Sequence, residues 1–97
     1  MRFRLEKIGM NEGHRSAVSI GRSIEGSDAF IKDYNSDTTP VALLKLSDLK
    51  AGYMVIVHGF MDYIKTSPVS EIISSDETEL VFKTDTSTYK LEIINEE

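Results

Sequence analysis

The chain has 97 residues, of which 40% are hydrophobic and 28% charged, and its net charge is −5 at pH 7. This length fits a single domain over residues 1–97, and the composition excludes a disordered tail, a coiled coil and a collagen-like chain. The absence of cysteine excludes a disulfide scaffold, a thiolate metal site and a cysteine nucleophile. Because no apolar run could span a bilayer and no signal-peptide pattern opens the chain, we expect a cytoplasmic protein that does not enter a membrane.

The distribution of charge separates the two ends of the chain. Residues 1–24 carry five basic and two acidic side chains, whereas residues 76–97 carry two basic and seven acidic ones. This asymmetry predicts that the first and last strands lie side by side and form cross-strand charge pairs. The alternative is an acidic face that meets a basic partner. The acidic total argues against a general nucleic-acid binder.

The N-terminal segment predicts two strands. In residues 2–6, Phe3 and Leu5 alternate with charged side chains, which is the pattern of a half-buried strand with these two residues inward. Residues 16–20 predict a second strand of the same kind.

Residues 28–34 have two interpretations. A short helix capped by Ser27 is favoured, because Phe30 and Tyr34 would stack one helical turn apart. The alternative is a strand over residues 29–34. The polar stretch that follows, residues 35–40, predicts a loop.

Residues 41–46 predict a strand with Ala42, Leu44 and Leu46 on one side. Residues 47–52 then offer capping residues, about one turn of helix and a glycine that ends it.

The C-terminal half is richer in strand signals. Residues 53–61 are apolar on both faces, which predicts a central strand, and residues 63–65 continue the sheet after a tight turn. Pro68 predicts a bend before the next strand, residues 69–73.

The last hairpin has the clearest pattern. Residues 79–84 and 88–94 alternate apolar and polar side chains around a short polar connector, so we expect Phe82 and Leu91 to be buried. With the other segments this gives about seven short strands with regular turn signals. The sequence therefore predicts a mainly β fold, specifically a small SH3-like or OB-like antiparallel barrel with at most one short helix near residues 28–34.

Residues 52–94 also resemble small uncharacterised bacterial and phage β-domain proteins with a T-S-P-V … T-x-x-S-x-Y pattern. That resemblance implies an SH3-like or related small barrel and no activity. A physical reason for the pattern is that Thr and Ser hydroxyls can bond backbone groups where a proline interrupts a ladder. The residues that carry the resemblance are Thr66, Ser67, Pro68, Val69, Thr84, Ser87 and Tyr89.

Motifs for catalysis or cofactor binding are weak. The two histidines, His14 and His58, lack a second ligand at the spacing usual for zinc, and we expect His58 to be a half-buried structural residue near a strand end. No serine lies in a nucleophile motif, and the glycines are scattered rather than gathered in a phosphate loop. We therefore expect no enzyme activity, no cofactor and no metal site.

A binding role has more support. The turn around residues 60–65 combines aromatic side chains with a cation, and the last hairpin supplies acidic residues that could steer a partner. The plainer interpretation is a solvated turn and an ordinary acidic edge. The candidate binding residues are Phe60, Asp62, Tyr63, Lys65, Asp76, Glu77, Glu79 and Asp85.

Two functions remain open. The first is a non-enzymatic protein-interaction module or small regulator or inhibitor, of the kind that phages and mobile elements encode, with a protein partner or a second copy of itself. The alternative is a single-stranded nucleic-acid or nucleotide binder of the small-barrel type, with aromatic side chains as stacking platforms.

Overall fold

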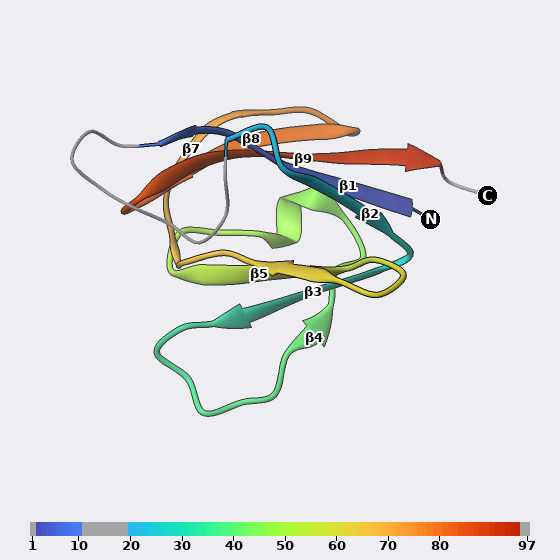
Figure 1. The fold of residues 1–97 in the computed structure, drawn as a ribbon. Helices are drawn as coiled ribbons and strands as arrows, with labels where there is room; N and C mark the ends of the chain where they lie inside the picture. The colour runs from blue at the N-terminus through green and yellow to red at the C-terminus, as the bar shows by residue number, and fades with distance from the viewer. Residues whose placement is uncertain (1, 11–19, 96–97) are drawn as a thin grey trace.

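Two antiparallel β-sheets face each other across one hydrophobic core in the computed structural model (Figure 1). The structure describes residues 2–10 and 20–95. The five-stranded sheet has the order β2-β1-β9-β8-β7, and the four-stranded sheet has the order β4-β3-β5-β6. The elements are β1 Arg2–Met10, β2 Ser23–Gly26, β3 Asp28–Asp33, β4 Val41–Ala42, the 3-10 helix η1 Leu46–Asp48, β5 Tyr53–His58, β6 Tyr63–Lys65, β7 Val69–Ser75, β8 Glu79–Thr84 and β9 Ser87–Asn95.

The prediction of a mainly β, antiparallel fold is confirmed. Within the described residues the ladders form two separate sheets, so the closed SH3-like or OB-like barrel stays a prediction. The strand expected over residues 16–20 lies outside the described residues, apart from Ile20, which lies in the turn before β2.

The last hairpin forms as its pattern predicts. Phe82 of β8 and Leu91 of β9 are completely buried, and the ring of Phe82 stacks on Tyr89 with 5.6 Å between centroids. The hydroxyl oxygen of Thr84 accepts the N–H of Ser87 at 3.1 Å, which closes the connector. Thr66 similarly accepts the N–H of Val55 at 3.1 Å. Both threonine hydroxyls therefore bond backbone N–H groups, Thr84 within the β8–β9 connector and Thr66 on β5.

The helix favoured over residues 28–34 is wrong, and the alternative strand is correct. Ala29 and Ile31 point into the core, whereas Phe30 faces the other side, so the period is two. The segment lies between β4 and β5, whose backbones satisfy its N–H and C=O groups. A helix this short is marginal by itself, so the tertiary pairing determines the outcome.

The predicted strand over residues 41–46 is also largely wrong. β4 covers only two residues, and Leu44, expected inside, is 72% exposed. Leu46, of the expected set, is buried, and Leu43 and Leu49 are buried with it, so the buried leucines have a period of three around the 3-10 turn η1. Gly52 follows with φ +89°, a conformation that favours glycine, and leads the chain into β5.

The two ends of the chain pair as the charge pattern predicts. β1 and β9 are antiparallel neighbours, with Arg4 opposite Glu92 and Glu6 opposite Lys90. The ammonium of Lys90 lies 4.0 Å from the Glu6 carboxylate and 3.6 Å from that of Glu92. Alternating charges therefore cover the middle of the outer face over β1 and β9.

We expect Arg4→Glu to destabilise the fold by roughly 0.5–1 kcal/mol at low salt, because the new carboxylate faces Glu92 and lies beside Glu6. Arg2→Glu, opposite Asn95, should cost less, and the double variant should show the sum. Urea denaturation at low and high salt measures both. A loss that does not shrink with salt would contradict the charge-pair explanation.

Candidate partner-binding site

The outer faces of the two sheets differ in character. The five-stranded sheet presents the charge network just described, whereas the outer face of the four-stranded sheet is apolar and aromatic. We call this second surface the aromatic face. Its residues are Phe30, Met54, Ile56, His58 and Tyr63, with Asp28, Lys32 and Lys65 as its charged members.

Strand register gathers these side chains from three segments of the chain. Phe30, Ile56 and Lys65 stand in one row across β3, β5 and β6. The next row toward the β5–β6 turn holds Asp28, His58 and Tyr63, and the row on the other side holds Lys32 and Met54. Since side chains alternate between faces along a strand, the members of all three rows point away from the core.

Aromatic rings meet across this register. The His58 ring stacks on Tyr63 with 5.6 Å between centroids and meets the edge of Phe30 at 5.9 Å. Tyr63 is 57% exposed, so the outer part of this cluster is open to solvent. His58 is exposed rather than half-buried as expected, and its ring is an aromatic contact surface.

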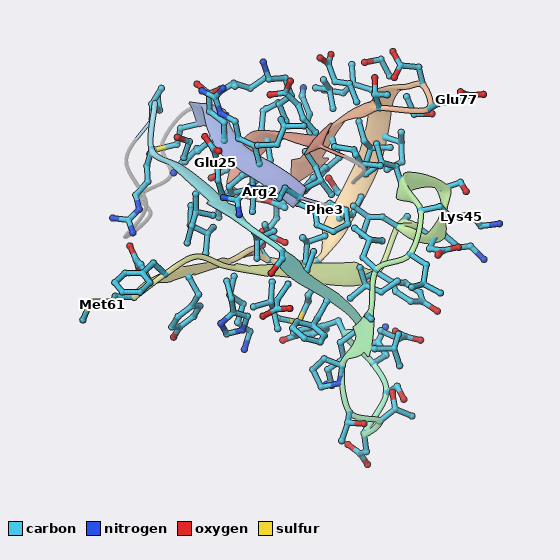
Figure 2. The ribbon with its side chains drawn as sticks, turned by 90° about the vertical axis from the view of Figure 1, so that its right-hand side faces the viewer. Arg2, Phe3, Glu25, Lys45, Met61 and Glu77 are labelled. Carbon is cyan, nitrogen blue, oxygen red and sulfur yellow. The ribbon has the colours of Figure 1, made fainter. Side chains whose placement is uncertain are left out.

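The turn between β5 and β6 carries two large apolar side chains with almost no cover. Phe60 is 97% and Met61 87% exposed, and Met61 points away from the body of the molecule in Figure 2. A backbone hydrogen bond and an ion pair stabilise the turn itself. The N–H of Gly59 donates to the carbonyl of Asp62 at 2.8 Å, and the Asp62 carboxylate forms an ion pair with Arg22.

The acidic candidates are not brought to this turn. Asp76 accepts the N–H groups of Thr78 and Glu79, each at 2.8 Å, and these bonds lower the pKa of its carboxyl. Asp76 therefore shapes the β7–β8 turn. Glu77, in the same turn, lies beside a hollow of about 450 Å³ that Lys45 also lines.

The expected joint surface of turn and acidic hairpin is consequently wrong. The β5–β6 turn pairs with Arg22, just before β2 at one edge of the five-stranded sheet, whereas the β7–β8 turn lies at the opposite edge. These edges are about 20 Å apart at the usual strand spacing, and Figure 2 separates Met61 from Glu77 accordingly. Asp85 lies at the other end of β8 from Glu79. Of the candidates, Phe60, Asp62, Tyr63 and Lys65 form one surface, and Asp76, Glu77, Glu79 and Asp85 do not join it.

A polar hollow of about 260 Å³ adjoins the turn. Arg2 and Glu25 line it from the five-stranded sheet, and Asp28, His58 and Phe60 line it from the other side. The part of the chain that the structure describes holds no group of three metal-ligating side chains.

Sequence reasoning missed Phe30, Met54, Ile56, His58 and Lys32 as members of the site. Met54, Ile56 and His58 belong to β5, and a strand that is apolar on both sides normally indicates a central, covered position. Phe30 and Lys32 belong to the segment for which the sequence pattern favoured a helix. Only the register between β3, β5 and β6 shows that these residues lie on one face, where His58 is exposed, Phe30, Lys32 and Ile56 are half-buried and Met54 is buried.

Comparison of the chain with models of known protein families, with curated protein sequences and with solved structures found no match. Among the described residues, no helix is long and apolar enough to cross a membrane.

Proposed function

We propose that this chain is a non-enzymatic protein-interaction module that binds its partner through the aromatic face and the Phe60–Met61 turn. The observation that carries the proposal is the near-complete exposure of Phe60 and Met61. A turn whose backbone is already held by hydrogen bonds loses little backbone entropy on binding, and aromatic anchors dominate the energy of protein interfaces.

The surroundings of the turn support the same role. The aromatic cluster of His58 and Tyr63 lies directly behind it, and charged residues border it. This arrangement, an apolar centre with a polar rim, is the usual anatomy of an interface. A small regulator or inhibitor would use such a surface. The passage of the chain from β2 to β3, between the two sheets, favours the SH3-like or OB-like barrel as the form of the module.

One observation favours single-stranded nucleic acid as a second candidate partner. Phe30, His58 and Tyr63 share the aromatic face with the cations Lys32 and Lys65, and bases stack on such rings. The overall charge of −5 and the carboxylate of Asp28 on the same face oppose phosphate binding. An oligonucleotide titration at low and moderate salt separates the candidates, because binding to phosphates must weaken steeply with salt.

We expect Phe60→Ser to leave the free energy of unfolding within about 0.5 kcal/mol of the parent, because its side chain is almost fully in solvent. The same change should sharply reduce capture of a protein partner. The measurement is cross-linking in the native host, with a photoreactive residue at position 61.

Leu44→Ser is the matched control, because Leu44 is also an exposed apolar residue but lies after β4, outside the aromatic face. A probe at Lys83, on the outer face of the five-stranded sheet, measures background adducts. Adducts at position 61 no stronger than those at position 83, or equal loss in both serine variants, would remove the proposed function.

A further inference from the structure

We propose that the partner that fits the aromatic face is a second copy of this chain, so that two copies associate face to face through their four-stranded sheets. The inference rests on the proposed function, since it requires the aromatic face to bind protein. It is carried by the symmetry of charge along β3. Asp28 and Lys32 lie on the outer side of β3, two residues before and two residues after Phe30.

This spacing is self-complementary. We place a two-fold axis in the plane of the interface, perpendicular to the strands and along the row of Phe30 and Ile56. Rotation about this axis reverses the direction of β3 in the second copy. Asp28 then faces Lys32 of the second copy, and Lys32 faces its Asp28, so that one operation forms two opposite-charge pairs. Phe30 and Ile56 meet their own equivalents at the centre.

The central residues on the proposed two-fold axis are apolar, as the centre of an interface requires. Phe30 and Ile56 are half-buried in the single chain and lie in one row on adjacent strands. Sheets packed face to face stand about 10 Å apart with their strands nearly aligned, which lets such side chains interdigitate. On the outer face of the five-stranded sheet, Val81 stands in one row with Lys90 and Glu6, so the described residues offer no comparable apolar row there.

The proposed contact surface is small. Two strands of six residues, β3 and β5, and one of three residues, β6, give a surface smaller than the roughly 800 Å² per partner of a standard interface. We therefore expect a reversible dimer that forms at micromolar concentrations or above. The exposed Phe60–Met61 turn, at one end of the same face, extends the contact area.

Lys65 distinguishes a second copy from any acidic partner. It stands in the row of Phe30 and Ile56, on which the axis lies, so it faces Lys65 of the second copy at the border of the interface. Replacing it by threonine removes a like-charge pair and should strengthen self-association. With an acidic peptide or a nucleic acid as partner, the same substitution removes an attraction and should weaken binding.

The experiment is sedimentation velocity over a range of concentrations, with the parent chain as the reference for every variant. Asp28→Lys alone and Lys32→Asp alone each convert both pairs to like charges and should raise the dimer dissociation constant about tenfold or more. In an equimolar mixture of these two variants, one chain carries lysine at both positions of β3 and the other carries aspartate at both. Opposite charges then face each other again, so the mixture should form heterodimers. Lys65→Thr should lower the dissociation constant of the parent chain.

Restored association in the mixture, together with tighter association of Lys65→Thr, establishes the face-to-face dimer. A parent chain that is monomeric at every concentration, or a mixture no more associated than its components, overturns it. The proposed function is tested separately, because cross-links from position 61 to a different protein would support it even without a dimer. Binding of an oligonucleotide that Lys65→Thr weakens would instead assign the face to nucleic acid.

Discussion

Truncation of Phe82 to alanine should cost about 3–5 kcal/mol of unfolding free energy, the largest effect we expect from a single core substitution. The side chain is completely buried in β8, between the two sheets, and its ring is stacked on Tyr89. The change removes both the transfer free energy of the ring and its contacts, and it leaves a cavity. Leu91→Ala, in the neighbouring strand β9, should cost about 3 kcal/mol for the same reason.

Chemical denaturation of both variants provides the measurement, with Val81→Ala as the control. Val81 precedes Phe82 in the same strand but faces outward and is only half-buried, so its truncation should cost about 1 kcal/mol or less. Losses of similar size at positions 81 and 82 would mean that the facing of the last hairpin is wrong. In a domain of this size, the expected loss at Phe82 is a large share of the total stability.

The hairpin could be predicted because its information is local. Alternation in residues 79–94 and the polar connector specify both strands and the turn without reference to the rest of the chain. The pairing of β1 with β9 was also predictable, because opposite charges are concentrated at the two ends.

The errors fall where local and tertiary signals disagree. Residues 28–34 fit a helical pattern, yet they form a strand because β4 and β5 pair with their backbone on both sides. Residues 41–46 fit a period of two, whereas the chain around the 3-10 turn η1 buries every third residue, Leu43, Leu46 and Leu49. Sequence propensity does not distinguish a strand from a helix or a 3-10 turn in these segments, since each of them buries apolar side chains.

The candidate site was predictable only in its turn. Phe60, Asp62, Tyr63 and Lys65 are close in sequence, so they stay together in any fold that forms the β5–β6 connection. Phe30 joins them through pairing of β3 with β5, and the acidic turn is separated from them because β1, β9 and β8 lie between β2 and β7. Both facts depend on strand order, which alternation alone does not specify.

The second large effect should come from Gly26→Ala, at the point where the chain leaves the five-stranded sheet for the four-stranded one. A Cβ atom at Gly26 would overlap the backbone carbonyl oxygen of His58 and lie 2.8 Å from its carbonyl carbon. These are backbone atoms, so a rotamer change cannot relieve the overlap, and β2 must separate from β5. We expect a loss of about 2–3 kcal/mol, typical of a backbone shift forced by overpacking.

Gly9→Ala is the matched control, because Gly9 also lies in a strand and its added Cβ would meet Thr88 at an ordinary 3.5 Å. That variant should unfold within about 1 kcal/mol of the parent. The shift in Gly26→Ala also displaces the end of β5, where His58 and the Phe60–Met61 turn begin, so cross-linking at position 61 should fall along with stability. Equal stability of the two alanine variants would contradict the close approach of β2 to β5. A destabilised Gly26→Ala that cross-links normally would show that the aromatic face is positioned by β3 and β6 and does not depend on this approach.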